Sequence, residues 1–198
     1  MRKVSDYYSK KAKKEKYPAR SVYKLEEVQK KYRLLRRGDS VLDLGCYPGS
    51  WSLYASEIVG VSGLVVGVDL QQADWQPRSG SADIHWLCDD ITNEELIVRL
   101  RRIRPAFKVL LSDLAPKTTG NRWADHQQSI NLARLTLTLA ETLLHPKGHY
   151  LVKVFQGEDF PGFFDEVKKQ FALVKTIKPK SSRTESREVF VLGMEYGR

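Results

Sequence analysis

Hydrophobic and polar residues change their spacing repeatedly along the chain, and these changes predict alternating helices and strands. In Arg20–Tyr32, the apolar residues Val22, Leu25 and Val28 recur at the spacing of a helix with one buried stripe. Short and nearly continuous apolar runs such as Leu64–Asp69 are instead typical of strands buried inside a sheet.

Runs of the two kinds alternate over most of the sequence. The predicted strands are Ser40–Gly45, Leu64–Asp69, Ile84–Leu87, Phe107–Asp113, Gly148–Phe155, Leu173–Ile177 and Glu188–Leu192. The predicted helices are Arg20–Tyr32, Trp51–Val59, Glu94–Arg102, Asp125–Leu144 and Phe160–Phe171. Alternating strands and helices predict an α/β fold with a mostly parallel seven-stranded sheet covered by helices on both faces. In such sheets, ligands bind beyond the carboxyl ends of the strands, near the point where the strand order reverses.

Composition places few limits beyond those of a globular protein. With 198 residues, the chain is long enough for one domain with a full core and no disulfide or metal support. It has no apolar run that would span a membrane or form a signal segment, so we expect neither. Cys46 and Cys88 lie outside any Cys-x-x-Cys pattern, which is typical of a reducing compartment, so we expect the cytoplasm. The four histidines show no ligand spacing, and we expect no metal site.

The formal net charge of +9 is spread unevenly. Residues 1–16 hold seven basic and two acidic groups, which is +5 and leaves +4 for all other residues. We therefore expect a basic N-terminal arm, residues 1–16, followed by a single domain, residues 17–198. Clustered positive charge is typical of a polyanion binder, although a solvated tail would look the same. A second basic group near Glu188 favours nucleic acid; it consists of Lys175, Lys178, Lys180, Arg183 and Arg187.

The first predicted strand leads into the turn Asp43-Leu-Gly-Cys-Tyr-Pro-Gly-Ser-Trp51, at the nucleotide-binding position of a doubly wound fold. The turn lacks both the Gly-x-Gly-x-x-Gly spacing and the ending of a P-loop, so phosphate-bearing cofactors are poorly supported. Gly45 and Gly49 allow close approach of a ligand, and the helix that follows offers free backbone N–H groups to a carboxylate.

Two acids extend this candidate cofactor site. Asp69 ends the second strand and is placed to accept hydrogen bonds from ribose hydroxyls, and Asp90 follows the third and could accept from an adenine amino group. These demands match S-adenosylmethionine, a nucleoside with an amino-acid tail and no phosphate. As an alternative, each acid only caps the segment after its strand. Among the aromatic residues, we favour Trp51 for stacking on adenine or a base over Tyr23, Trp75, Trp86 and Trp123, because most aromatic residues fill cores.

A second group of candidates consists of charged residues inside apolar patterns. Lys153 interrupts the apolar run Tyr150–Phe155, where a lysine is costly to desolvate unless it is paired or used. Asp113 ends one predicted strand, Glu188 opens another, and Lys24 interrupts the first predicted helix. If these strands are neighbours, the four groups can meet at one edge of the sheet. Singly, each has a plainer explanation as a salt bridge or a solvated helix residue.

The motifs around these candidates resemble those of the RrmJ (FtsJ) family of ribosomal RNA 2′-O-ribose methyltransferases, over nearly the whole chain from about Tyr17. The segments that carry the resemblance follow one another in this order: Ser21-Val-Tyr-Lys-Leu25, Asp43-Leu-Gly-Cys-Tyr-Pro-Gly-Ser-Trp51, Leu111-Ser-Asp-Leu-Ala-Pro116, Val152-Lys-Val-Phe-Gln-Gly157 and Ser181-Ser-Arg-Thr-Glu-Ser-Arg-Glu-Val-Phe190. The resemblance implies a Rossmann-like methyltransferase fold that uses S-adenosylmethionine.

The resemblance also implies roles for single residues. It implies a catalytic tetrad of Lys24, Asp113, Lys153 and Glu188, and cofactor contacts from Gly49, Trp51, Asp69, Asp90 and Asp113. Two departures matter: the family often has Ala-Ala-Pro-Gly-Gly where this chain has Cys46-Tyr-Pro-Gly-Ser50, so the turn is bulkier. The doublet Asp89-Asp90 leaves the adenine partner open by one position.

Methyl transfer from a sulfonium to a ribose hydroxyl is an in-line displacement. Positioning can lower its barrier by about 7–11 kcal/mol, and general-base assistance adds about 10²–10⁴-fold in rate. We hypothesise that Lys153 accepts the hydroxyl proton or stabilises the developing alkoxide, that Asp113 orients it near the sulfonium, and that Lys24 and Glu188 hold the ribose. Burial and Lys24 favour a neutral Lys153 amine, whereas the two carboxylates favour the ammonium, so both roles stay open.

The favoured substrate is a uridine of large-subunit ribosomal RNA. We expect the protein to act as a monomer and not to bind a membrane. The same chemistry on transfer RNA or a messenger cap is the nearest alternative. A non-catalytic RNA-binding module would normally show substitutions in the tetrad, and all four residues are present. A small-molecule methyltransferase would not need the basic arm or the basic cluster near Glu188.

Overall fold

The computed structural model describes residues 3–183 and 185–197, with side chains from residue 7 onward, so Arg2 of the predicted arm and Thr184 of the last motif lie outside the described residues. The elements in chain order are α1 (Lys3–Lys14), α2 (Val22–Tyr32), β1 (Ser40–Leu44), α3 (Ser50–Val59), β2 (Leu64–Asp69), β3 (Asp83–Cys88), α4 (Glu95–Ile103), β4 (Phe107–Ser112), α5 (Arg122–Leu143), β5 (Leu144–Phe155), α6 (Phe160–Gln170), β6 (Phe171–Ile177) and β7 (Glu188–Tyr196).

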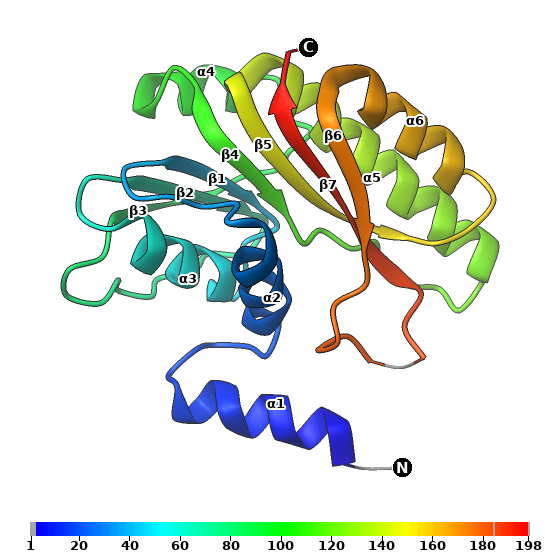
Figure 1. The fold of residues 1–198 in the computed structure, drawn as a ribbon, viewed down its shortest axis with the longest axis horizontal. Coiled ribbons are helices and arrows are strands. Elements are labelled where there is room, and N and C mark those ends of the chain that lie inside the picture. Colours follow the sequence, from blue (N-terminus) through cyan, green and yellow to red (C-terminus); the bar gives the residue numbers. More distant parts are fainter. Residues whose placement is uncertain (1–2, 184, 198) are drawn as a thin grey trace.

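The strands of the described residues form one seven-stranded sheet in the order β3-β2-β1-β4-β5-β7-β6. The pairs from β3 across to β5 are parallel, whereas β7 runs antiparallel to both of its neighbours. Helices cover both faces of the sheet (Figure 1). The predicted α/β fold with a mostly parallel sheet is therefore confirmed. The order reverses between β1 and β4, so the carboxyl ends of these strands mark the expected ligand position.

The sheet separates two hydrophobic cores because alternate residues of each strand face opposite sides. In β1, Leu42 and Leu44 pack in one core with residues of α4, α5 and α6. Val41 packs in the other core with residues of α2 and α3. The predicted stripe of α2 is used as expected, since Leu25 and Val28 are buried in this second core.

The predicted basic arm contains the helix α1, for which the apolar pattern gives no signal. Its inner surface consists of few residues: Ala12 is buried, and Tyr8 packs on Tyr23 of α2 with ring centroids 5.4 Å apart. The ammonium of Lys11 lies 4.1 Å from the centroid of the Tyr23 ring. Two contact residues among many lysines are too few to form a periodic apolar pattern.

Several element boundaries differ from the predicted ones for local reasons. Helix α5 begins at Arg122 because the side chain of Asn121 caps it, accepting hydrogen bonds from the backbone N–H groups of Trp123 and Ala124. Strand β5 begins at Leu144, which pairs with Phe107 of β4, so the strand starts earlier than the predicted Gly148. No helix in the described part of the chain is long and apolar enough to cross a membrane.

Candidate active site

Three adjacent strands place acidic and basic side chains at one edge of the sheet. Asp113 directly follows β4, whose last residue, Ser112, pairs with Val152 of β5. The next residue of β5 is Lys153, and Glu188 opens β7 opposite Phe155. Because β4, β5 and β7 are neighbours, residues far apart in sequence become neighbours in space.

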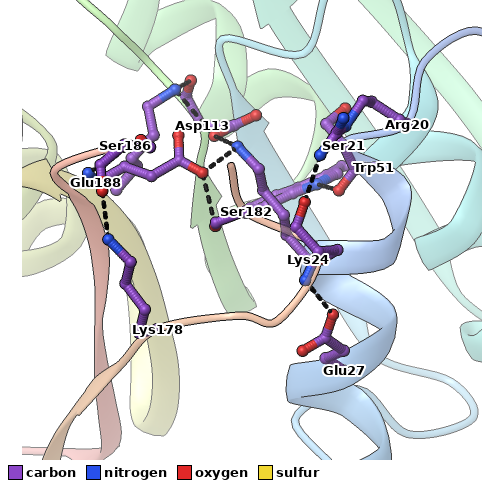
Figure 2. A network of polar contacts seen from close by, with 12 residues as sticks. Arg20, Ser21, Lys24, Glu27, Trp51, Asp113, Lys178, Ser182, Ser186 and Glu188 are labelled. Atoms are coloured by element: carbon purple, nitrogen blue, oxygen red, sulfur yellow. Dashed lines mark hydrogen bonds and ion pairs between the residues drawn. The ribbon is translucent and has the colours of Figure 1, made fainter. Parts of the chain in front are cut away.

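The four residues predicted as a tetrad lie together and form a chain of ion pairs. The ammonium of Lys153 lies 2.9 Å from Oδ1 of Asp113, and it also donates a hydrogen bond to the Asp113 carbonyl. Lys24, from α2, lies 2.7 Å from Oε1 of Glu188 and 4.0 Å from Oδ1 of Asp113 (Figure 2). The Lys153 side chain is only 8% exposed, so these charges interact in surroundings that hold little water.

The carboxylate of Glu188 has further support from the loop before β7. The Ser182 hydroxyl donates to Oε1 of Glu188 at 2.7 Å, and the Glu188 backbone N–H donates to the Ser186 hydroxyl at 3.2 Å. Burial acts to raise the pKa of Glu188, but the charge and hydrogen bond of Lys24, the Ser182 hydroxyl and the charge of Lys153 outweigh it and lower this pKa. Glu188 is therefore ionised at neutral pH.

Helix α2 is held against α3, which fixes the origin of the Lys24 side chain. The indole N–H of Trp51 donates to the carbonyl of Ser21 at 2.8 Å, and the Ala19 N–H donates to the Ser50 hydroxyl at 2.7 Å. Both hydrogen bonds join the segment at the start of α2 to the first turn of α3. These contacts determine which way Lys24 leaves its helix.

The same helix is also attached to the loop of residues 178–187. Arg20 donates to the carbonyl of Ser181 at 2.6 Å, and Glu27 accepts hydrogen bonds from the backbone N–H groups of Lys180 and Ser181 (Figure 2). Lys178 donates to the carbonyl of Ser186 across the loop. The loop that supports Glu188 and the helix that carries Lys24 are thus positioned as one unit.

A cavity of about 490 Å³ opens between this helix and this loop. Its volume is within the range of sites that bind small molecules or single nucleotides. The residues that line it are Arg20, Ser21, Lys24, Arg183, Glu185, Ser186 and Glu188. Two members of the tetrad therefore face a space that is accessible from solvent, with two arginines on its wall.

The predicted cofactor turn lies at the carboxyl end of β1 and requires both of its glycines. Gly45 has a φ of +77°, and a Cβ there would come within 2.7 Å of the Leu114 side chain. Gly49 has a φ of +111°, is the N-cap of α3, and a Cβ there would lie 3.0 Å from the Trp86 ring. A side chain at either position would be strained and would collide with a neighbouring residue, so both positions favour glycine.

Asp43, just before this turn, is a candidate that the tetrad and cofactor lists from sequence leave out. It is completely buried, and its Oδ2 accepts a hydrogen bond from the Ser52 hydroxyl at 2.6 Å. Among the described residues, its Oδ1 has no hydrogen-bond partner. Burial raises the pKa of Asp43 to about 7; the Ser52 hydrogen bond opposes this rise, and the charges of Asp113 and Asp69 add to it. An acid that ends a buried strand before a glycine turn is the sequence signal for it.

Two of the predicted cofactor acids, Asp69 and Asp90, already accept hydrogen bonds from loop residues. Asp69 accepts hydrogen bonds from the backbone N–H groups of Tyr47 and Gln71, both at 3.0 Å. Asp90 is exposed, and one of its oxygens accepts from the N–H and hydroxyl of Thr92, both at 2.8 Å. The plainer capping explanation therefore holds for part of each carboxylate, and a contact with a cofactor stays a prediction.

The doublet of acids after β3 divides its tasks. The Asp89 carboxylate accepts from the Asn93 amide at 2.9 Å and pairs with the guanidinium of Arg99. The side-chain amide of Asn93, partly opposed by burial, is the leading cause of the lowered pKa of Asp89. Asp89 is thus occupied by its own loop, which leaves Asp90 as the better adenine candidate.

Trp51 is placed differently from the expectation that it stacks on a base. It is only 2% exposed, with its ring centroid 5.7 Å from that of Phe190 and its indole N–H bound to Ser21. Its place between α2 and α3 supports the helix that carries Lys24. The buried ring offers no exposed face to a base or to adenine, and the cofactor contact of Trp51 stays a prediction. Trp75 and Trp123 are the exposed indoles, at 44% and 65%.

Metal ligation has no support in the described residues, where no group of three or more His, Cys, Asp or Glu side chains could hold an ion. Both cysteines in this part of the chain are free, Cys46 buried and Cys88 exposed.

Comparisons with known proteins agree with the fold. A family model described as FtsJ-like methyltransferase matches residues 17–196. Ribosomal RNA large subunit methyltransferase E of Desulfotalea psychrophila is 64% identical over 99% of this chain and 98% of its own length. The protein of the same name from Desulfosudis oleivorans is 45% identical over 97% and 91%. A crystal structure from Plasmodium falciparum, assigned as a ribosomal RNA methyltransferase, superposes with a TM-score of 0.78 and 27% identity over 92% of this chain and 100% of that one.

Proposed function

This chain belongs to the FtsJ-like methyltransferase family, and we propose that it transfers a methyl group from S-adenosylmethionine to a ribose 2′-hydroxyl of RNA, at a uridine of the large ribosomal subunit. The observation that carries the proposal is the buried chain of ion pairs from Lys153 through Asp113 and Lys24 to Glu188, at the edge of a cavity. Two ammonium groups beside two carboxylates can hold a hydroxyl group and stabilise charge on its oxygen.

The residues around the glycine turn fit S-adenosylmethionine. The unpartnered buried oxygen of Asp43 suits an ammonium or another donor. Gly45 and Gly49 keep the turn free of side chains where it packs closely on Leu114 and Trp86. Asp69 and Asp90 offer acceptors for ribose hydroxyls and an adenine amino group. When bound, the cofactor supplies a methyl group made electrophilic by its sulfonium.

The chain's own residues then act on the ribose hydroxyl. Lys24 and Glu188 line the cavity and can bind the hydroxyls of the target sugar. Lys153 has two possible tasks: its neutral amine accepts the hydroxyl proton, or its ammonium stabilises the alkoxide as that proton leaves for solvent. Asp113 positions Lys153 in either case, because its carboxylate forms an ion pair with this side chain and its carbonyl accepts a hydrogen bond from it. A rate that titrates with pH indicates the first task, and a flat profile the second.

Support for RNA as the substrate comes from charge and from relatives. Arg20 and Arg183 on the cavity wall suit the phosphates on either side of a target sugar. The lysines of α1, which precede Arg20 in the sequence, add positive charge, as a polyanion binder requires. The relatives that are 64% and 45% identical are named for large-subunit ribosomal RNA. We propose that the active protein is a cytoplasmic monomer and that RNA is its partner.

The test supplies labelled S-adenosylmethionine with separate pools of large ribosomal subunits, small subunits, free ribosomal RNA and transfer RNA. We expect label in large-subunit RNA with the wild-type chain and none with Lys153→Ala. Lys168→Ala, an exposed lysine of α6 paired with Asp165, is the matched control and should label as the wild type does. Label in transfer RNA alone would refute the ribosomal substrate, and no label in any pool would favour a non-catalytic RNA-binding module.

A further inference from the structure

We propose that Trp123 is a stacking platform for a base of the substrate RNA, beside the nucleotide that the tetrad holds. This inference rests on the proposed function, because it takes RNA as the substrate. Trp123 is 65% exposed, which is unusual for the largest apolar side chain in a protein. It lies in the first turn of α5, outside the tetrad, the cofactor turn and the cavity lined by Lys24 and Glu188.

The backbone presents this indole rigidly. The side chain of Asn121 accepts hydrogen bonds from the N–H groups of Trp123 at 3.1 Å and Ala124 at 3.2 Å, which fixes the start of the helix. The buried carboxylate of Asp125 accepts from the N–H and hydroxyl of Thr119, at 2.7 and 2.9 Å. The segment that leads into α5 is therefore attached to the first turn of this helix at Thr119.

A second set of contacts ties the same turn to the tetrad. The guanidinium of Arg187, the residue before Glu188, donates to the carbonyl of Arg122 at 3.3 Å. The carbonyl of Arg187 accepts from the N–H of Gln156, just beyond β5, at 2.9 Å. The start of β7, the end of β5 and the start of α5 thus meet beside the site. Helix α5, which carries Trp123, covers the face of the sheet opposite to α2, which carries Lys24 (Figure 1).

The chemistry around Trp123 suits a nucleotide. Arg122 and Lys117 are exposed, and with Arg187 they provide cations for phosphates on either side of a stacked base. Two acids of this region are occupied internally, Asp125 by Thr119 and Asp159 by the amide of Gln127. A stacked base needs one aromatic face with cations around it, and this turn offers both.

A protein partner fits this surface less well. Interfaces between proteins bury a contiguous apolar patch, and here the indole stands among polar residues. Asn121 and Arg122 precede it, and Gln127 lies one helical turn further on. A single exposed ring matches a single base.

The test measures binding of the full chain to two fluorescein-labelled oligomers at one fixed salt concentration. One is a twelve-nucleotide oligouridine, and the other is an abasic oligomer with the same number of phosphates. We expect Trp123→Ala to bind oligouridine about tenfold more weakly and the abasic oligomer as the wild type does, since stacking needs the base and phosphate contacts do not. Trp123→Leu should match Trp123→Ala, and Trp123→Phe, which keeps an aromatic face, should stay within about threefold of the wild type.

Leu173→Ala on the edge strand β6 is the matched control, an exposed apolar side chain away from the site, and should change neither affinity. Equal binding of oligouridine by Trp123→Ala and wild type, or no binding by the wild type, would overturn the inference. Equal losses for both oligomers would do the same, since they would show a phosphate effect. If Trp123→Ala methylates free ribosomal RNA normally but intact subunits poorly, the indole contacts a ribosomal protein instead. Each of these results leaves the proposed function standing as long as the wild type methylates RNA and Lys153→Ala does not.

Discussion

The tetrad and the cofactor turn lie at the same edge of the sheet, but their charges are satisfied in opposite ways. In the tetrad each carboxylate has an ammonium partner, Asp113 with Lys153 at 2.9 Å and Glu188 with Lys24 at 2.7 Å. Around the turn, Asp43 accepts from a hydroxyl, and the candidate cofactor acids Asp69 and Asp90 accept from backbone and hydroxyl groups. Within the described residues, Oδ1 of Asp43 and Oδ1 of Asp113 both lack a hydrogen-bond partner, but the Asp113 oxygen forms ion pairs with Lys153 and Lys24.

This difference indicates two kinds of task. A set of mutually paired charges keeps its geometry without a ligand, as preorganised electrostatic catalysis requires. A buried carboxylate with an unused oxygen is costly by itself and gains from a ligand that donates to it. The tetrad is thus suited to catalysis, and the turn is suited to binding a ligand.

Removing the tetrad's buried lysine should have the largest effect. We expect Lys153→Ala to lower the single-turnover rate of methylation by about 10³-fold, because it removes both possible tasks of this side chain. Binding of S-adenosylmethionine, measured by calorimetry, should change little. Lys153→Arg separates the tasks: recovery of activity would show that a fixed cation suffices. A tenfold loss of cofactor affinity in Lys153→Ala would contradict the division between the two regions.

The pH dependence of stability should identify the turn's acid. The pKa of Asp43 is raised to about 7 in the folded chain, above the usual value of about 3.9 when unfolded, so the folded state binds the proton more tightly. Its contribution to stability is complete below about pH 4 and is lost as the pH rises toward about 7, by up to about 4 kcal/mol.

Urea unfolding at several pH values, without cofactor, measures this contribution. The difference in stability between the wild type and Asp43→Asn should fall over that range of pH, because the amide does not titrate. Ser186→Ala, in the loop near the tetrad, provides the control and should give a difference that does not change with pH in this way. A constant difference for Asp43→Asn would mean that Asp43 has an ordinary pKa.

The same substitution should weaken the cofactor. Because hydrogen bonds to a charged group are worth about 1.5–3 kcal/mol, we expect Asp43→Asn to bind S-adenosylmethionine about 10- to 100-fold more weakly, measured by calorimetry near pH 8. RNA affinity at the same pH should be unchanged. Unchanged cofactor affinity would assign Asp43 to structure alone.

The smallest effect is expected for the support of Glu188. Ser182→Ala removes the 2.7 Å hydrogen bond to this carboxylate, which Lys24 continues to hold, so the rate of methylation should fall by only about fivefold. Ser182→Thr keeps a hydroxyl and should recover most of the rate. A loss as large as that of Lys153→Ala would show that the serine, and not the ion pair, positions Glu188.

The parts of the fold that follow periodic patterns were predictable from the sequence. Strand β2 has the predicted bounds, because a continuous apolar run ends in an acid. The same logic located Lys153, since a lysine inside an apolar strand has few explanations. That Asp113 and Glu188 lie beside Lys153 depends on the order of the strands in the sheet, which the apolar pattern does not determine.

Features that depend on a few contacts between distant residues were not predictable. The helix α1 rests on contacts such as that of Tyr8 with Tyr23, which leave no period in the sequence. The buried Trp51 donates a hydrogen bond from its indole N–H to the carbonyl of Ser21, a residue thirty positions earlier. The unused oxygen of Asp43 depends on the packing around it, which no spacing rule describes.

The most direct test of the account is the chemical position of the transferred methyl group. Large ribosomal subunits from cells that lack this enzyme are incubated with the chain and labelled S-adenosylmethionine, and the RNA is digested to nucleosides and analysed by mass spectrometry. The account predicts that the label appears in 2′-O-methyluridine with the wild type and is absent with Lys153→Ala. Label on a base, or equal 2′-O-methylation by both proteins, would contradict it.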